Sequence, residues 1–219
     1  MSRRSRRAEL IDSGVNVLHR WGYTAASIDR IAESAGVSKG AFFVHFDSKE
    51  TFTVEVLRHY FYRWRDYVEK IMDDPDMSAV GKLRAMLAAI TDNAVIAPYV
   101  SGSLIGNISA ELSDEYGSIR STIAKIFLDW AEPLETVIEA GQKAGEFNGA
   151  VPALAARFIV NSLQGALLRC KVDCASTALD DFEEVVFNVL LRSKDPGSRK
   201  RIVTEGAIHK VDECPSLAK

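Results

Sequence analysis

Apolar residues recur along most of the chain at intervals of three and four, the spacing that places side chains on one face of an α-helix. One long run spans residues 48–72 and contains Phe52, Val56, Tyr60, Trp64, Tyr67 and Ile71. The alternation of apolar and polar residues that is typical of strands is almost absent. The pattern therefore predicts an all-α protein with one long helix over residues 48–72.

Three shorter helices are predicted before that long helix. The first covers residues 6–20 and ends before Gly22, and the second begins after the N-capping residue Ser27 and ends near Gly36. The third covers residues 39–46 and is capped by Ser38. Glycine suits the turn at position 36 because it adopts positive φ angles without steric cost. Two short helices joined by such a turn form a helix-turn-helix.

The remainder of the chain predicts a helical body. Its expected helices cover residues 78–96, 101–113, 116–144, 151–172 and 177–192. Pro133 is expected to kink or break the third of these helices, whereas Pro152 suits a first helical turn. Thr177 and Asp180 resemble a capping box at the start of the last helix.

These elements predict three parts of the chain. Residues 1–50 form an N-terminal three-helix domain, and residues 51–193 form a C-terminal helical domain that is joined to it by the 48–72 helix. The apolar periodicity disappears after residue 193, so residues 194–219 are expected to form a flexible tail.

Composition and charge are those of an ordinary globular protein. The chain has 219 residues, is 47% hydrophobic and carries a formal net charge of −3, yet basic residues outnumber acidic ones in its first 50 positions. No run approaches the roughly 20 apolar residues of a membrane span, and the basic N-terminus lacks the apolar core of a secretory signal. We therefore expect a cytoplasmic protein with no membrane partner and a basic end that binds a polyanion.

The sequence carries no signal of catalysis. Its four histidines do not follow metal-ligand spacing, and no GxSxG, P-loop or GxGxxG motif is present. Glu111, Asp114 and Glu115 cluster, but such a cluster is more typical of a solvated helix end. We expect no enzymatic activity, no cofactor and no metal.

The 39–46 helix has the composition of a DNA recognition helix. Its small residues Gly40, Ala41 and Val44 allow the helix backbone to lie deep in a major groove. The helix N-terminus with Ser38 suits a phosphate, and Lys39 can reach a base edge or a phosphate. The basic segment at residues 3–7 is expected to be a loose arm that can enter a minor groove. A plain three-helix packing unit is the alternative interpretation.

Several short motifs in residues 8–57 occur together in a known family. They are Gly22-Tyr23, Ser27-Ile28, Ile31-Ala32, the run from Ala35 to Gly40, His45-Phe46 and Lys49-Glu50. In this combination they strongly resemble the DNA-binding domain of TetR/AcrR repressors. The resemblance implies a homodimeric regulator that binds double-stranded operator DNA.

The family's contacts can be transferred only to matching positions. They imply phosphate contacts by Ser27 and Lys49, a further backbone contact by His45, and base contacts by residues 39–41. The family usually has tyrosine where this chain has Phe43, so the hydroxyl that contacts a phosphate is missing. Phe43 can still contact a sugar or a thymine methyl group.

The helical body after residue 50 contains the residue types that line small-molecule sites, which are aromatic side chains and a few polar groups. The candidate residues are Trp64, Tyr67, Tyr99, Asn107, Phe127, Trp130 and Gln164. Plain core or dimer packing is the alternative interpretation for each of them. The family resemblance implies a repressor that is released from DNA by a small-molecule effector.

Three segments, with Trp130, further resemble one TetR branch, which senses reactive electrophiles or small unsaturated acids. The segments are residues 102–107, 141–146 and 164–166. Some members of that branch carry a sensing cysteine where this chain has Ser103, and serine supplies no thiolate at ordinary pH. Oxidation of Cys170 and Cys174, which share a helix face, and control by a protein partner remain alternatives to a ligand.

The last two predicted helices are the expected dimer surface. Residues 177–192 carry a strong apolar stripe, and the resemblance implies that this helix and the 151–172 helix pair with their copies in a four-helix bundle. A dimer presents two recognition helices about one turn of DNA apart, so the operator is expected to be a near-palindrome.

Overall fold

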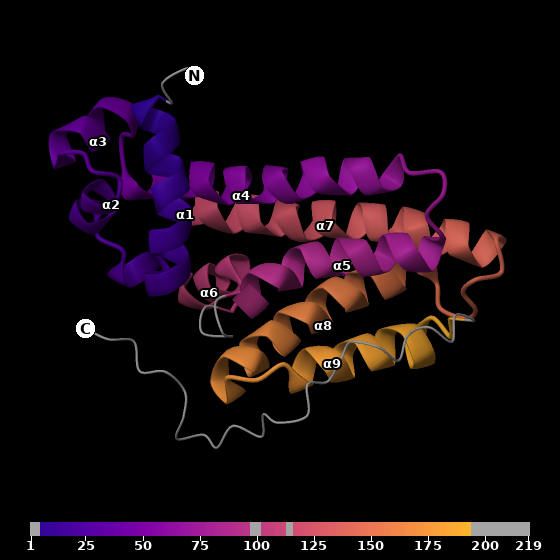
Figure 1. Ribbon diagram of the computed structural model, residues 1–219. Helices are drawn as coiled ribbons and strands as arrows, with labels where there is room; N and C mark the ends of the chain where they lie inside the picture. The colour runs from indigo at the N-terminus through magenta and orange to yellow at the C-terminus, as the bar shows by residue number, and fades with distance from the viewer. Residues whose placement is uncertain (1–4, 97–101, 113–115, 194–219) are drawn as a thin grey trace. The chain divides into compact units, whose positions relative to one another are not determined.

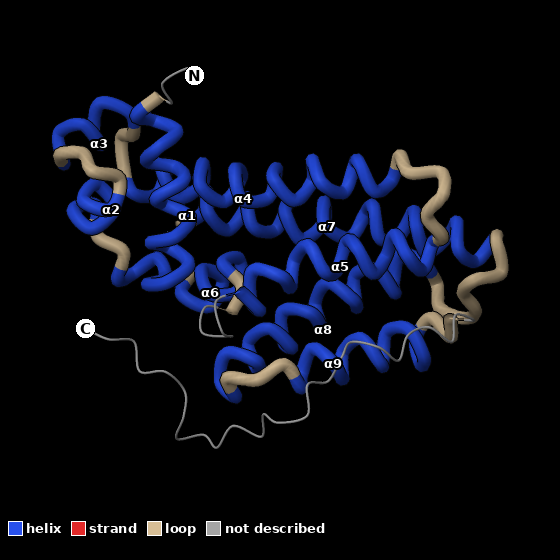
Figure 2. Tube along the Cα trace, viewed as in Figure 1, coloured by secondary structure: helices blue, strands red, loops and turns tan. Residues whose placement is uncertain are grey.

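The computed structural model describes residues 5–96, 102–112 and 116–193. Every regular element within these ranges is a helix, so the all-α prediction is confirmed (Figures 1 and 2). The candidate ligand residue Tyr99, the predicted tail at 194–219 and the first part of the predicted basic arm lie outside the described residues.

The helices follow the chain in the order α1 to α9. Their bounds are α1 Arg6–Ala25, α2 Ile28–Ser34, α3 Lys39–His45, α4 Lys49–Met72, α5 Ala79–Ile96, α6 Leu104–Glu111, α7 Gly117–Lys143, α8 Pro152–Asp173 and α9 Thr177–Glu184, followed by the π-helical turn η1 Val185–Leu190. In the described part of the chain, no helix is long and apolar enough to cross a membrane.

Three details differ from the sequence prediction. Helix α7 runs unbroken through Pro133, so the predicted break is wrong, while the alternative of a kink stays a prediction; the side chains of Trp130 and Leu134 are buried on the same face there. The residue that precedes α9 is Ser176, whose hydroxyl donates to Asp180 at 2.9 Å, so the predicted Thr177–Asp180 capping box is wrong. The last helix also widens after Glu184 into η1, which has the hydrogen bonds of a π-helix.

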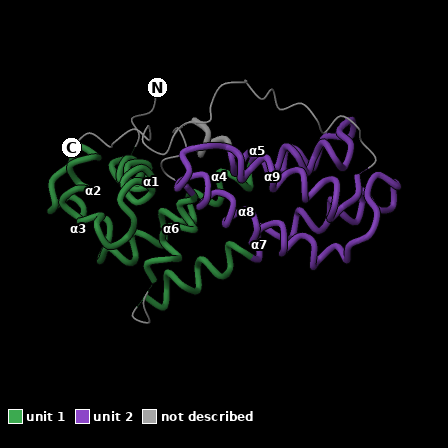
Figure 3. The backbone as a smooth tube through the Cα atoms, turned by 90° about the horizontal axis from the view of Figure 1, so that it is seen from below, with its two compact units in different colours: residues 1–66, 103–127 green, residues 67–102, 128–219 purple. Residues whose placement is uncertain are grey.

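The described residues form two compact units (Figure 3). Unit 1 comprises residues 1–66 and 103–127, and unit 2 comprises residues 67–102 and 128–219. Helices α4 and α7 each contribute residues to both units. Each unit is therefore made of two segments that alternate along the chain. The predicted division at residues 50 and 193 is a division by function and stays a prediction.

Each unit has its own buried core. In unit 1 the rings of Phe42, Phe46 and Phe52 form a cluster with centroid distances of 4.9–5.5 Å, which joins α3 to the start of α4. In unit 2 the long α8 packs along α9, and Phe147 and Phe187 are among the largest fully buried side chains. Burial of such apolar surface is the main stabilising contribution to each unit.

Candidate DNA interface and effector-binding residues

Two serines and one glycine set the geometry of the helix-turn-helix. The Ser27 hydroxyl accepts from the Arg30 amide at 3.2 Å, and the Ser38 hydroxyl accepts from the Ala41 amide at 3.2 Å. Between the two helices Gly36 has a φ of 65°, and nothing within 4 Å would meet an added Cβ there. Glycine is therefore required at this turn for its backbone conformation and not for space.

Helix α3 is held by one side chain and presents the others outward. Phe42 is its buried residue, while Phe43 and Val44 are 46% and 79% exposed. Lys39 and Gly40 are also exposed, and Ala41 and His45 are half-buried. An exposed valine does not contribute to folding by burial, but it can contact the methyl group of thymine in a major groove.

Lys39 lies in an ion pair with Asp29 of α2. Its Nζ is 2.9 Å from Asp29 Oδ2, and both side chains are more than half exposed. Exposed pairs of this kind contribute only about 0–1 kcal/mol. A phosphate or a base edge can therefore replace Asp29 as the partner of Lys39.

The structure places Lys49 differently from the contact that the resemblance implied. Its ammonium group donates to the Tyr23 carbonyl oxygen at 2.9 Å and lies 4.3 Å from the centre of the Tyr23 ring. Burial lowers the pKa of Lys49, and the nearby charge of Glu111 opposes that shift. In this structure Lys49 ties the start of α4 to the end of α1, and its phosphate contact stays a prediction.

Glu111, at the end of α6, is an organising residue that the sequence interpretation missed. Its carboxylate accepts from the backbone amides of Tyr23 and Thr24 at 3.2 and 2.7 Å. These amides follow a break in α1 at Gly22, which has a φ of 71°, and so lack the usual helical acceptors. A Cβ at Gly22 would overlap the Glu111 carboxylate. Glycine is therefore required here for both conformation and space.

Tyr23 lies at the centre of this junction. Its ring meets that of Tyr116 edge-on at 4.7 Å. Burial raises the pKa of Tyr23 to about 12, with smaller contributions from Tyr116 and Glu50. The junction thus fixes the end of α1 through polar contacts from α4 and α6, all of them within unit 1.

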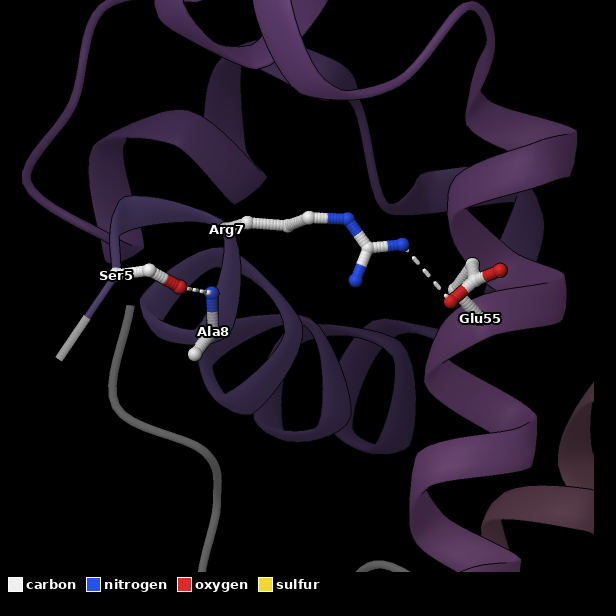
Figure 4. Close-up of polar contacts among 4 residues, drawn as sticks. All are labelled: Ser5, Arg7, Ala8 and Glu55. Carbon is white, nitrogen blue, oxygen red and sulfur yellow. Dashed lines mark hydrogen bonds and ion pairs between the residues drawn. The ribbon is translucent and has the colours of Figure 1, made fainter.

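The predicted basic arm is partly wrong. Ser5 caps α1 by accepting from the Ala8 amide at 3.3 Å, so Arg6 and Arg7 belong to the helix (Figure 4). Arg7 also bonds to Glu55 of α4 at 3.0 Å and lies over the Phe46 ring. Arg7 therefore anchors α1 to α4 and is not part of a loose arm.

The candidate effector residues are distributed over both units. Trp64, Asn107 and Phe127 lie in unit 1, and Tyr67, Trp130 and Gln164 lie in unit 2. Both tryptophans are buried, whereas Tyr67 is largely exposed. Asn107 donates to the His19 carbonyl oxygen at 3.4 Å, which is a weak bond.

The candidate Gln164 has an unsatisfied side-chain amide. Both Oε1 and Nε2 are buried, and neither has a hydrogen-bond partner in the described part of the chain. A buried polar group without a partner costs about 1–3 kcal/mol. The amide of Gln164 is thus suited to a partner that supplies both a donor and an acceptor.

The motif at residues 141–146 has a structural role in unit 2. Glu146 accepts from the amides of Ala79 and Val80 at the start of α5, at 3.2 and 3.0 Å. Gln142 donates to the Ala150 carbonyl oxygen at 2.7 Å. A Cβ at Gly141 would overlap the Phe147 ring. The contacts of Gln142 and Gly141 close the turn between α7 and α8, and those of Glu146 join this turn to the start of α5.

Ser103, at the position where the resemblance implied a sensing cysteine in some members of one branch, caps α6. Its hydroxyl accepts from the Gly106 amide at 3.2 Å, and the residue is buried. Cys170 is also buried and is a free thiol, so no disulfide joins it to Cys174. Burial raises the pKa of the Cys170 thiol, which reduces its thiolate fraction at neutral pH.

Helix α8 has apolar residues on two faces. One face is buried in unit 2, and the other is exposed to solvent together with part of η1, which continues α9. The exposed apolar residues, each between 45% and 67% accessible, are Val151, Leu154, Phe158, Leu168, Val172, Val185 and Val189. We call them the α8–α9 stripe. An exposed apolar surface of this extent is typical of an interaction site.

Family models match both parts of the chain. Residues 10–56 match a model described as bacterial regulatory proteins of the tetR family, and residues 79–186 match one described as a tetracyclin repressor-like C-terminal domain. The HTH-type transcriptional repressor DhaR of Mycobacterium sp. (strain GP1) is 34% identical over 89% of this chain and 97% of its own length.

Solved structures show the same fold. A regulatory protein TetR from Rhodobacter sphaeroides superposes with a TM-score of 0.75 at 22% identity and covers 83% of this chain and 96% of its own. The reduced form of Escherichia coli NemR superposes with a TM-score of 0.72 at 22% identity, over 84% and 95% of the two chains.

Proposed function

The chain belongs to the TetR family of transcriptional regulators, and on that premise we propose that it is a repressor released from its operator by a small molecule. Regulators of this family bind DNA, act as dimers and are generally not enzymes. The observation that carries the proposal is the exposure of α3, which Ser38 caps and which Phe42 holds on the core. We place the protein in the cytoplasm, where its operator is accessible.

The DNA contacts of the proposal follow the exposed side of the helix-turn-helix. Lys39 and Gly40 would face the base edges together with Ala41, and Phe43 and Val44 would supply apolar contacts. The Ser27 and Ser38 hydroxyls accept from backbone amides, which leaves their own protons available for phosphates. His45 and Lys49 would act as backbone contacts at the far end of α3.

A selection experiment tests the repressor's DNA recognition. The full chain is used to select duplexes from a randomised pool, and the enriched sequences are read. We expect a near-palindrome whose half-sites lie about 10 base pairs apart, because a dimer presents two copies of α3. Enrichment of no sequence over the starting pool would contradict the proposal.

The dimer of the proposal is formed through the α8–α9 stripe. These side chains are apolar and exposed in the single chain, and burial against a second copy would remove about 25 cal/mol of unfavourable hydration free energy per Å². Leu154→Asp together with Phe158→Asp is expected to give monomers in analytical ultracentrifugation. A dimer of unchanged stability in this variant would place the interface elsewhere.

The effector part of the proposal is supported by the unsatisfied amide of Gln164. An effector with one donor and one acceptor would satisfy both atoms, and α4 and α7 link unit 2 to unit 1 by continuous helix. The buried Cys170 thiol gives less support to thiol oxidation as the signal. A thermal-shift screen of small metabolites, followed by operator release, tests this part. Absence of any hit would favour control by a protein partner.

A further inference from the structure

An exposed tryptophan at the end of α1 carries two arginines on its ring. Trp21 is 41% exposed, which is unusual for its size and apolar area. The guanidinium carbon of Arg30, from α2, lies 4.1 Å from the ring centroid, and that of Arg20 lies 5.2 Å from it. Arg30 also donates to the Ala25 carbonyl oxygen at 3.0 Å. We call these three side chains the Trp21 platform.

The positive charges of the Trp21 platform have no carboxylate partner among the described residues. Neither Arg20 nor Arg30 lies within ion-pair distance of a carboxylate in the part of the chain that the structure describes. Two other cations of the same unit differ in this respect, because Arg7 pairs with Glu55 and Lys39 pairs with Asp29. The platform therefore presents two cationic groups on one exposed ring, which favours an anionic partner.

Stacking on the Trp21 ring orients the guanidinium groups of Arg20 and Arg30 for contact with phosphate. A guanidinium that lies over an aromatic ring keeps the N–H groups along its edge available, and that edge matches two phosphate oxygens. The ring and the bond to Ala25 also restrict Arg30 before binding, which reduces the entropy lost in the complex.

The platform is continuous with the helix-turn-helix. Arg30 lies in the first turn of α2, where its own amide donates to the hydroxyl of Ser27. Residues 27 and 30 are three apart and so share one face of the helix. Ser27 is a proposed phosphate contact, and Arg30 connects it to Trp21 near the end of α1.

We propose that the Trp21 platform contacts backbone phosphates of the same duplex, beside the groove that α3 enters. The inference rests on the proposed function of the helix-turn-helix. It adds Arg20 and Arg30 as phosphate contacts and assigns Trp21 as the residue that positions them. Because phosphates are the same at every base pair, the platform strengthens binding to all sequences equally.

The test is the salt dependence of duplex binding by the full chain. Two duplexes of about 40 base pairs are used, one selected by the wild-type protein and one of mixed sequence. Arg20→Gln and Arg30→Gln should each reduce the slope of log affinity against log salt concentration by about 0.9 per lost phosphate contact, in both subunits of the dimer and on both duplexes. Trp21→Ala should have a similar effect, whereas Trp21→Phe, which retains a ring, should keep most of the slope.

Arg65 supplies a matched control. It lies 5.5 Å from the Tyr62 ring on α4, so it makes the same kind of contact outside the helix-turn-helix. Arg65→Gln should leave the slope unchanged. A second measurement uses only the wild-type protein and therefore does not depend on a variant that folds. The selected duplex is shortened stepwise, and the slope of log affinity against log salt concentration should fall when the phosphates bound by the platform are removed.

The outcomes separate this inference from the proposed function. If the double variant Arg20→Gln/Arg30→Gln and the trimmed duplexes keep the wild-type slope while Lys39→Ala weakens binding, the platform is not a DNA contact and the repressor proposal stands. If the wild-type protein enriches no duplex from the randomised pool, both proposals are wrong.

Discussion

Two glutamates, one in each unit, make the same chemical contact in different settings. Glu146 in unit 2 accepts from two successive amides at the start of α5, an ordinary helix N-terminus with buried side chains. Glu111 in unit 1 accepts from two successive amides after the break in α1 at Gly22. Glu146 therefore caps the N-terminus of a regular helix. Glu111 instead binds the amides at which α1 continues after its break.

The comparison extends to the polar groups around each glutamate. In unit 1 the junction groups are paired, since Lys49 bonds to Tyr23 and Asn107 to His19. In unit 2 the Gln164 amide and Nη2 of Arg84 are buried without a hydrogen-bond partner among the described residues. The difference indicates that unit 1 is stabilised in one shape by its own contacts, while unit 2 retains polar groups that suit an external partner.

Substitution of Gly22 should have the largest effect on stability. Gly22→Ala places a Cβ on the Glu111 carboxylate and strains a backbone conformation that is essentially restricted to glycine, so we expect a loss of about 3 kcal/mol in the free energy of unfolding. Gly36→Ala is the control, because only the backbone is strained there, at about 1 kcal/mol. Urea denaturation of both variants measures the difference. Equal losses would show that Glu111 does not restrict position 22.

The two glutamates can then be compared directly. Glu111→Gln and Glu146→Gln each replace one accepting oxygen by an NH₂ group, and each should lower the free energy of unfolding by about 1–2 kcal/mol. Only Glu111→Gln should also weaken duplex binding, because it loosens the end of α1 beside the helix-turn-helix. Thermal melting and duplex titration of both variants check this. Equal duplex affinities in the two variants would contradict a specific role of Glu111 in DNA binding.

The junction should also respond to alkaline pH. The pKa of Tyr23 is raised to about 12 in the folded protein from an ordinary value of 10, so the unfolded chain loses this proton first. Stability contributed by the protonated phenol is complete below pH 10 and is lost as pH rises towards 12. The lowered pKa of Lys49 acts in the opposite direction, since the unfolded chain then holds the proton longer.

Comparison of wild type and Tyr23→Phe isolates that contribution. Melting temperatures recorded between pH 8 and pH 11 should fall more steeply above pH 10 for the wild type. Parallel curves for the two proteins would contradict the assignment to Tyr23.

The smallest expected effect concerns Gln164. Gln164→Leu removes two unsatisfied polar atoms and should raise the free energy of unfolding by up to about 1 kcal/mol without effector, while weakening the response to any effector found by screening. Gln142→Leu is the control and should lower stability, because the Gln142 amide is bonded to Ala150. A loss of stability in both variants would mean that the Gln164 amide is satisfied in solution.

Local signals in the sequence predicted the helices and the helix-turn-helix. Ser27, Gly36 and Ser38 act through bonds and conformations within a few residues, so their roles can be inferred from sequence alone. The junction at Tyr23 could not be inferred in this way. Its partner Glu111 is 88 residues distant along the chain, and a carboxylate at a helix end resembles many solvated ones.

Two errors have a similar origin in packing. Pro133 removes one backbone donor, yet buried side chains on the same helix face keep α7 continuous. Arg7 belongs to a basic run that suggests a loose arm, but Glu55 and Phe46 hold it on α4. In both cases a tertiary contact outweighed a correct local tendency.

The most direct test of the account is the affinity of a recognition-helix variant for the selected duplex. Lys39→Ala with Phe43→Ala changes two exposed side chains of α3 and should leave the melting temperature near that of the wild type. The account predicts that affinity for the selected duplex falls by about tenfold or more, towards that for a mixed-sequence duplex. Unchanged affinity for the selected duplex in the folded variant would contradict the claim that α3 reads DNA.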